Sequence, residues 1–429
     1  MPFKMGAASP RLMPRRMQGS ARGWVGARHA GGLSRSHLVL LAYLTLMGAA
    51  FLPVFEGYDP LREGITSRRA YEIGLMGLGT ALLASYVAFR ATPSLRYAKS
   101  EIHVLVGFAL LAFASSLWSL SPVLTMVKAG QLIVIAFGAA LLVPLSRRHP
   151  RVLRDLPYLI ALSVLGLVSV YLGVNYLVWG TAVPYVEIEN GPVRLLLGYA
   201  HPLVSGNLAV LGVIGLLASN RGIPAKALLA APLIGVLLAT NARASMVGLL
   251  VALACMSLLN PDPVGRRRLV AALAIAYASY LTLTLAGVSM AALAESFEKY
   301  SRWESIQGLS GRVELWSYTL GRILDRPMLG VGYEAGRYVL LQYAPWAATA
   351  HNSFLDIAVG TGILGLLLLF LFSIELLRTI RWTRDALLMG VAAQTYVYGM
   401  TSMALFVPSF GMLVLILSIT RAALLARAR

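Results

Sequence analysis

Long, unbroken apolar stretches recur along the chain and are separated by short polar segments. Hydrophobic residues fill these stretches without the alternation of a half-buried strand, so the pattern predicts helices and not a membrane barrel. Their lengths suit bilayer crossing, and we count about twelve spans. The predicted spans are 37–55, 70–89, 102–117, 124–145, 157–176, 202–219, 225–239, 246–259, 269–290, 353–374, 386–403 and 408–425.

Composition agrees with this all-α polytopic membrane fold. Hydrophobic residues make up 58% of the 429 residues, charged residues make up 13%, and the mean hydropathy is +0.72. A soluble domain carries about 25% charged residues. The chain has one cysteine, Cys255, which can form no intrachain disulfide and which we interpret as a small core residue.

The net charge of +19 is distributed unevenly between the two sides of the predicted bundle. If the N-terminus is cytoplasmic, 25 of the 37 lysine and arginine residues fall in the tails and in alternate loops on the same side. This distribution is the positive-inside signature, and it places both termini in the cytoplasm. It also accounts for the basic character without nucleic acid as a partner.

This orientation divides the chain into four parts. Residues 1–36 are a basic, acid-free stretch that we expect to be a disordered cytoplasmic tail, and 37–290 hold spans one to nine. Residues 291–352 form the single long outward loop, in which apolar positions of 312–326 recur at helical spacing and predict an amphipathic helix. Residues 353–429 hold the last three spans and a short cytoplasmic tail.

Several basic residues lie at outward span ends, against the inward bias. They include Arg194, Arg243 in a short turn without an acid, and Arg312 at the start of the amphipathic helix. Guanidinium groups pair with phosphate oxygens in bidentate fashion, so an anionic substrate is one explanation. Snorkelling, or pairing with nearby acids, is the other.

Four further outward basic residues are given weaker roles. Arg62, Arg68 and Arg69 have acids nearby in sequence and are interpreted as ordinary surface residues, and Lys128 is left as a minor candidate near the outer end of a span.

His351 stands at the mouth of the tenth predicted span, at the end of the long loop. A neutral histidine at an apolar edge can act as a general base near pH 7, although many membrane-edge histidines have structural roles.

Motifs for other chemistries are absent from the sequence. It contains no HExxH, no P-loop, no GxSxG and no DxD, so we predict no metal and no cofactor. The segment Glu187-Ile188-Glu189 could hold a hard cation, but a polar loop is the simpler interpretation. The spans also lack the buried carboxylates typical of a proton-coupled pump.

One set of residues resembles a known family. It consists of Ser310-Gly311-Arg312 with Trp316, Leu329-Gly330-Val331-Gly332, and His351-Asn352 followed after nine residues by Gly362 and then Gly365. This set resembles the C-terminal region of O-antigen ligases and related polysaccharide polymerases. Arg243, preceded here by Ala242, and Arg194 fit the family pattern more loosely.

The resemblance implies a GT-C-like glycosyltransferase of the bacterial inner membrane with a periplasmic active site. Its donor would be a glycan on undecaprenyl pyrophosphate, its acceptor a sugar hydroxyl of lipid A–core, and its surroundings membrane lipid. We expect His351 to be the general base of a metal-independent, inverting transfer. Arg312 and Arg243 would be catalytic and would bind the pyrophosphate, and Arg194, Asn352 and Gly332 would bind substrate.

Three other functions remain open from the sequence. A polysaccharide polymerase would use the same arginines and histidine, and a protein O-oligosaccharyltransferase would use a different acceptor. A lipid-linked glycan transporter would perform no chemistry, and it predicts charged or broken helices near the bilayer midplane.

Overall fold

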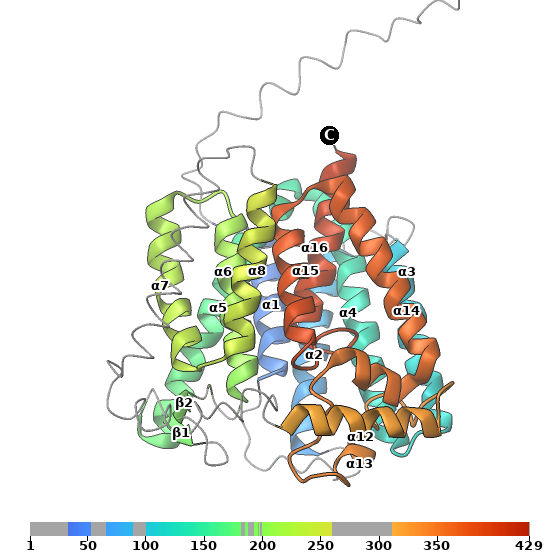
Figure 1. Cartoon of the computed structure of the whole chain (residues 1–429). Helices are drawn as coiled ribbons and strands as arrows, with labels where there is room; N and C mark the ends of the chain where they lie inside the picture. The colour runs from blue at the N-terminus through green and yellow to red at the C-terminus, as the bar shows by residue number, and fades with distance from the viewer. Residues whose placement is uncertain are drawn as a thin grey trace, which may run out of the picture.

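A computed structural model of the chain describes residues 33–52, 66–88, 100–181, 185–187, 193–195, 197, 200–259 and 311–428. Most of these residues lie in helices that run side by side as one bundle (Figure 1). The bundle helices are α1 (Arg35–Ala50), α2 (Ser67–Ala88), α3 (Ser100–Ala114), α4 (Pro122–Arg148), α5 (Pro150–Trp179), α6 (Pro202–Ala218), α7 (Ile223–Ala239), α8 (Arg243–Leu258), α14 (Ser353–Thr383), α15 (Ala386–Gly399) and α16 (Phe410–Arg427).

A helix lies at every predicted span that falls on described residues, whereas the predicted span 269–290 lies outside them. By length and composition, six of the described helices could cross a membrane: α2, α3 with the turn Ser115–Leu117 (η4), α4, α5, α14 and α16. Four others, α1, α6, α7 and α8, are apolar but shorter. The polytopic helical fold is therefore confirmed, and the number of about twelve crossings stays a prediction.

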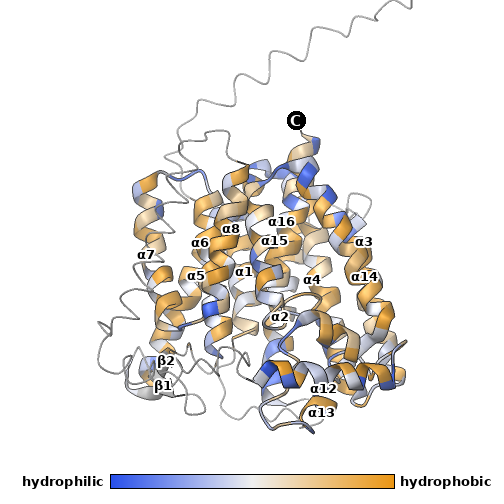
Figure 2. Ribbon diagram, viewed as in Figure 1, coloured by the Kyte–Doolittle hydropathy of each residue, from blue (hydrophilic) through white to orange (hydrophobic). Residues whose placement is uncertain are grey.

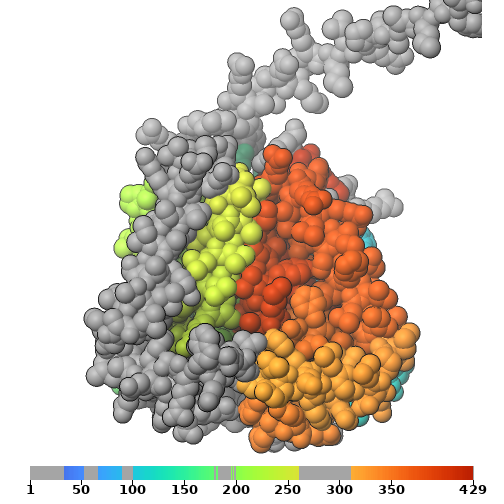
Figure 3. All heavy atoms as spheres, in the orientation of Figure 1, coloured from blue at the N-terminus to red at the C-terminus, as the bar shows by residue number. Residues whose placement is uncertain are grey.

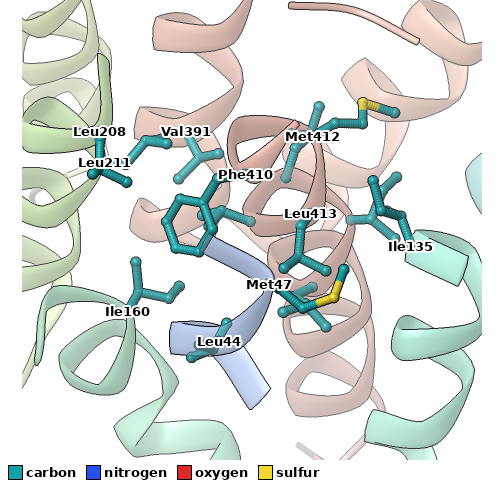
Figure 4. Close-up of a cluster of buried hydrophobic side chains, with 14 of the residues drawn as sticks. Leu44, Met47, Ile135, Ile160, Leu208, Leu211, Val391, Phe410, Met412 and Leu413 are labelled. Carbon is teal, nitrogen blue, oxygen red and sulfur yellow. The ribbon is translucent and has the colours of Figure 1, made fainter. Parts of the chain in front are cut away.

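The interior of the bundle is apolar and closely packed. Side chains from α1, α4, α5, α6, α15 and α16 meet in one continuous core (Figure 4). The hydropathy view shows apolar ribbon along the helices and polar residues concentrated toward their ends (Figure 2). Small residues allow close helix contacts, since a Cβ on Gly215 of α6 would lie 2.5 Å from the carbonyl oxygen of Pro157 in α5.

The end of the bundle that carries the C-terminus is held by ion pairs between helices. Arg421 of α16 donates hydrogen bonds to the carboxylate of Asp385, at 2.5 Å, and to the carbonyl oxygen of Leu153, at 2.6 Å. His37 of α1 lies 3.0 Å from a carboxylate oxygen of Asp155 in α5.

The opposite end carries the remaining elements (Figure 1). They are α12 (Arg312–Asp325), α13 (Arg337–Leu340) and an antiparallel hairpin of β1 (Tyr185–Glu187) and β2 (Val193–Leu195), in which Val186 pairs with Arg194. Helix α12 coincides with the predicted amphipathic helix at 312–326. The hairpin is a small addition to the helical fold, and its three-residue strands are too short for the sequence to show a detectable alternation.

A kink in α14 ties the loop after α12 to the bundle. Gly362 has φ 65° and ψ −159°, which only glycine adopts readily, and the kink frees carbonyl groups upstream. Those of Val359 and Gly360 accept hydrogen bonds from the amides of Val331 and Gly332, each at 2.9 Å. The loop therefore docks on α14 through backbone hydrogen bonds, which fixes the segment that leads to His351.

Candidate active site

A cavity of about 730 Å³ opens at the bundle end that carries α12 and α13. Its described walls come from six parts of the chain: the end of α1, the first turns of α2 and α4, the start of α6, the loop from 334 to 351, and the region from 395 to 411. The charged and titratable side chains among the described lining residues are Arg68, Arg69, Glu72, Lys128, His201, Glu334, Arg337, Tyr398 and His351.

His351 lies in the wall of this cavity, directly before α14. Its backbone has φ 50°, a left-handed conformation that is uncommon for residues other than glycine. The amide of His351 donates to the hydroxyl oxygen of Thr349 at 3.2 Å, and its ring lies 6.2 Å from the ring of Trp346, centroid to centroid. The imidazole is therefore held at a defined place beside the cavity.

The surroundings keep His351 neutral. The pKa of its imidazole is lowered from the usual 6.5 to about 4, chiefly by burial and in addition by the charges of Arg312 and His201. Burial also lowers the pKa of Arg312 below its usual range, while the nearby Tyr398 opposes that effect. These interactions place Arg312, His201 and His351 near one another.

Helix α12 brings Arg312 to this place. Gly311, at φ 79°, precedes the helix, and α12 then runs across the end of the bundle beside α14 (Figure 3). The indole Nε1 of Trp316 donates to the carbonyl oxygen of Ala350 at 2.8 Å, one residue before His351. Arg312 is thus connected to the histidine through the helix and this hydrogen bond.

Two motif residues that we predicted to bind substrate have clear packing roles. The side chain of Asn352 caps α14, since its Oδ1 accepts from the amides of Phe354 and Leu355 at 3.0 and 3.3 Å. Gly332 is buried at φ 104°, and a Cβ there would lie 2.3 Å from Oγ of Ser119. Gly332 is not among the described residues that line the cavity.

The two other predicted arginines are placed differently. Arg243 is the first residue of α8, is exposed, and is absent from the described part of the cavity lining. Arg194 lies in β2, but its side chain is outside the described part of the structure, as are Arg62 and residues 188–189 of the predicted cation motif. Of the predicted arginines, the structure brings Arg312 close to His351.

The interpretation of Arg68 and Arg69 as ordinary surface residues is wrong. Both line the cavity, and Arg69 is only 7% exposed. Lys128, the minor candidate, joins them and lies 2.7 Å from a carboxylate oxygen of Glu72. Glu72 is only 6% exposed and lies in the predicted span 70–89, so the expectation that the spans lack buried carboxylates is wrong. The acids near Arg68 and Arg69 in the sequence suggested surface ion pairs, but the sequence could not show that Lys128 of α4 shares their carboxylate. Two adjacent basic residues at the outward start of a span were a usable signal of a binding site.

A second ion pair faces the cavity from the loop. Nη2 of Arg337 lies 2.8 Å from Oε2 of Glu334, and both side chains are largely buried. Glu334 itself has φ 60°. Neither residue stands out in the sequence, because nothing in their local spacing distinguishes them from a surface pair.

The cavity suits an anionic group. Its described lining holds four basic side chains (Arg68, Arg69, Lys128 and Arg337) and two carboxylates (Glu72 and Glu334). The N-terminal turns of α2, α6 and α16 also line it, and helix N-termini attract anions. In the described part of the chain, no group of three or more His, Cys, Asp or Glu side chains could hold a metal ion.

Part of the chain that builds this cavity is similar to known proteins. Residues 228–370, which include Arg243, Arg312 and His351, match the family described as O-antigen ligase. A protein named O-antigen ligase from Pseudomonas aeruginosa (strain PAO1) is 31% identical over 134 residues. That alignment covers 31% of this chain and 29% of the relative, so less than a third of either protein is compared.

Proposed function

We propose that the protein is a membrane glycosyltransferase that attaches a polysaccharide to lipid A–core, because residues 228–370 match the O-antigen ligase family. The donor is the glycan on undecaprenyl pyrophosphate, and the acceptor is a sugar hydroxyl of lipid A–core. Both are amphiphiles, so their reacting groups can meet at a cavity where the bundle ends.

The observation that carries the proposal is the neutral His351 in the wall of a cavity lined by basic side chains. With a pKa lowered to about 4, the imidazole has a free lone pair at pH 7 and can accept a proton. The surrounding cations attract the diphosphate that must leave. One cavity therefore offers the two functions that the transfer needs.

The transfer proceeds by one displacement at the anomeric carbon. The acceptor oxygen forms the new glycosidic bond as its proton passes to His351. The bond between the anomeric carbon and the diphosphate oxygen breaks, and its electron pair leaves with undecaprenyl pyrophosphate. Attack opposite the leaving group inverts the anomeric centre. The proton on His351 then passes to solvent.

An imidazole with a pKa of about 4 is a weak base, because its conjugate acid is disfavoured. Binding of the donor corrects this, since a diphosphate next to Arg312 offsets the charge that acts on His351. The pKa of His351 therefore rises when the donor is present, and the base gains strength only when there is a leaving group to expel.

Guanidinium groups stabilise the charge that develops on the departing diphosphate. We assign this role to Arg312, which interacts with His351, and to Arg243 and Arg194. Asn352 and Gly332 support the site by holding the backbone around His351. Replacement of Arg312 by lysine keeps the charge but removes the bidentate geometry, so transfer is expected to fall.

We place the cavity on the periplasmic side of the inner membrane and both termini in the cytoplasm. The support for this orientation is the position of basic residues at helix ends. Arg147, Arg148, Arg151 and Arg384 lie where α4, α5 and α14 end or begin, opposite to the cavity, and the positive-inside rule puts the cytoplasm on that side.

The test is complementation of a strain that lacks its own ligase, read on a lipopolysaccharide gel. Cells with the wild-type protein attach O-antigen to core, and His351→Ala yields bare core while lipid-linked chains accumulate. Arg378→Ala, on the exposed pair with Glu375 far from the cavity, is the matched control and retains attachment. Attachment by the His351→Ala protein at wild-type level would refute the base assignment.

Other outcomes separate the competing functions. If the wild-type gene complements a polymerase deletion instead, so that single repeats on core become long chains, the protein is a polymerase. Glycosylated exported proteins in its presence indicate a protein O-oligosaccharyltransferase. Absence of any product from purified protein with donor and acceptor, combined with movement of donor across vesicles, indicates a transporter.

A further inference from the structure

The first turn of α2 forms a polar wall of the cavity, to which the proposed chemistry assigns only a general attraction for anions. Thr66, Ser67, Arg68 and Arg69 line the cavity consecutively, and Thr66 accepts a hydrogen bond from the amide of Arg69 at 3.3 Å. Two hydroxyl groups, two guanidinium groups and the N-terminus of a 22-residue helix therefore border the same space.

Glu72 organises the basic side chains on this wall. Its Oε1 lies 3.2 Å from Nε of Arg68, and its Oε2 lies 2.7 Å from Nζ of Lys128 in α4. The amide of Gln131 donates to the same Oε2 at 3.1 Å. Because Glu72 is itself only 6% exposed, it fixes the two cations in place across the α2–α4 contact.

The charged neighbours of this wall differ from those of the histidine. The charged and titratable groups that act on His351 are Arg312 and His201, whereas those that act on Glu72 are Lys128 and Arg68. The cavity thus borders two groups of titratable side chains on different elements. One is attached to the α12–α14 loop and the other to α2 and α4.

The charge of the α2–α4 wall favours an anion. Among the described lining residues, this wall presents the three basic side chains of Arg68, Arg69 and Lys128 and the carboxylate of Glu72. Cations that border a partly enclosed space attract a counter-charge more strongly there than in open water. The helix N-terminus adds positive potential at the same place, and the hydroxyl groups add hydrogen-bond donors.

We propose that Arg68, Arg69, Lys128 and the N-terminal turn of α2 form a second oxyanion-binding subsite, distinct from the Arg312–His351 centre. It binds a phosphate or carboxylate group of a substrate. Glu72 is its positioning residue, which holds Arg68 and Lys128 in register and does not contact the ligand.

This inference rests on the proposed function for the identity of the ligand. In a transfer between two lipid-linked glycans, the oxyanion has two sources. It is either the diphosphate of the donor or an acidic group on the acceptor oligosaccharide. Both are recognised by the same chemistry, and steady-state kinetics with each substrate varied separately distinguishes them.

The experiment compares purified wild type with Arg69→Ala, Arg69→Lys and the control Arg378→Ala. Loss of a charged hydrogen bond to an oxyanion weakens binding by about tenfold or more. We expect Arg69→Ala to raise the KM of one substrate by about that factor, with Arg69→Lys partly restoring it. A rise in the KM of the donor alone identifies the diphosphate as the ligand. A rise in the KM of the acceptor alone, which disappears when the acceptor is dephosphorylated, identifies an acidic group of the acceptor.

Calorimetric binding of inorganic pyrophosphate tests the subsite without any glycan transfer. Arg69→Ala is expected to weaken or remove pyrophosphate binding at the α2–α4 subsite, and Arg312→Ala is expected to leave that binding intact. If Arg69→Ala fails to fold, Lys128→Gln replaces it and is expected to weaken the same binding event by about tenfold, because it removes one of the cations of the subsite.

The positioning role of Glu72 has its own readout. Glu72→Gln is expected to change the KM of the same substrate as Arg69→Ala and to leave kcat within about twofold, because the subsite binds and does not react. A fall in kcat at unchanged KM would contradict this role.

The subsite is refuted if folded Arg69→Ala, or Lys128→Gln in its place, leaves both KM values and pyrophosphate binding within about twofold of wild type, a difference smaller than a charged hydrogen bond contributes. Failure of the proposed function has a different signature. In that case the wild type transfers no glycan, while its pyrophosphate binding still depends on Arg69.

Discussion

Arg312→Gln is expected to move the acid limb of the pH–rate profile to higher pH. The folded pKa of His351 lies at about 4, below its usual 6.5, so the imidazole is neutral at neutral pH. Loss of the base should therefore appear only as the pH falls toward 4. Removal of the positive charge of Arg312 makes protonation easier and brings this loss to a higher pH.

The magnitude follows from the two causes of the lowered pKa. Each pH unit corresponds to about 1.4 kcal/mol, so the surroundings disfavour the imidazolium by roughly 3 kcal/mol. Burial is the larger cause and remains in the variant, and Arg312 accounts for part of the rest. We therefore expect the acid limb to rise by about one pH unit, and not to return fully to the unperturbed value.

The assay measures kcat/KM for glycan transfer from about pH 4 to about pH 8, on either side of the usual histidine pKa. It compares wild type, Arg312→Gln and the control Arg322→Gln, whose ion pair with Asp325 is exposed. Because all variants are measured with the same substrates, the titration of the diphosphate affects every profile equally. The variant is expected to be slower, so we compare the pH at which the acid limb falls and not the maximal rate. A wild-type acid limb near 6.5 that is unmoved in Arg312→Gln would refute both the lowered pKa and its cause.

Three further predictions concern the structure that holds His351. Gly362→Ala would place a Cβ 2.3 Å from a carbonyl oxygen of the docked loop, at a positive φ, so we expect a lower Tm and a loss of about 2–5 kcal/mol in the free energy of unfolding. The control is Gly74→Ala, where no atom lies within 4 Å of the added Cβ and Tm should hold. Asn352→Ala removes the cap of α14 and should cost about 1 kcal/mol in thermal denaturation, with Asn352→Asp retaining most of the stability. Trp316→Phe removes the hydrogen bond to Ala350, so the free energy of unfolding should fall by only about 1 kcal/mol while kcat falls clearly. An unchanged kcat would show that α12 does not position the site.

Most of the fold could be predicted because apolar length and spacing are local properties. The helices α4, α5 and α14 follow directly from long apolar runs, and α12 follows from its amphipathic spacing. The β1–β2 hairpin could not be predicted, since it depends on pairing between two short segments with no alternation of their own.

The site could be predicted where one motif carried it. The sequence singles out His351 and Arg312 because their neighbours form a recognisable pattern, and their roles stay predictions. Arg69 was misjudged and Lys128 received little weight, because their place in the cavity depends on the contact between α2 and α4. There Lys128 pairs with a carboxylate 56 residues away in the sequence. Gly332 was assigned to substrate, whereas its close approach to Ser119 explains the need for glycine there.

The cavity draws its walls from both the first and the last described helices of the bundle, with Phe51 and Leu52 after α1 and with Phe410 and Gly411 at the start of α16. During synthesis the chain enters the membrane from its N-terminus, so this compartment stays open on one side until α16 is inserted. A nascent or prematurely terminated chain therefore cannot complete the pocket.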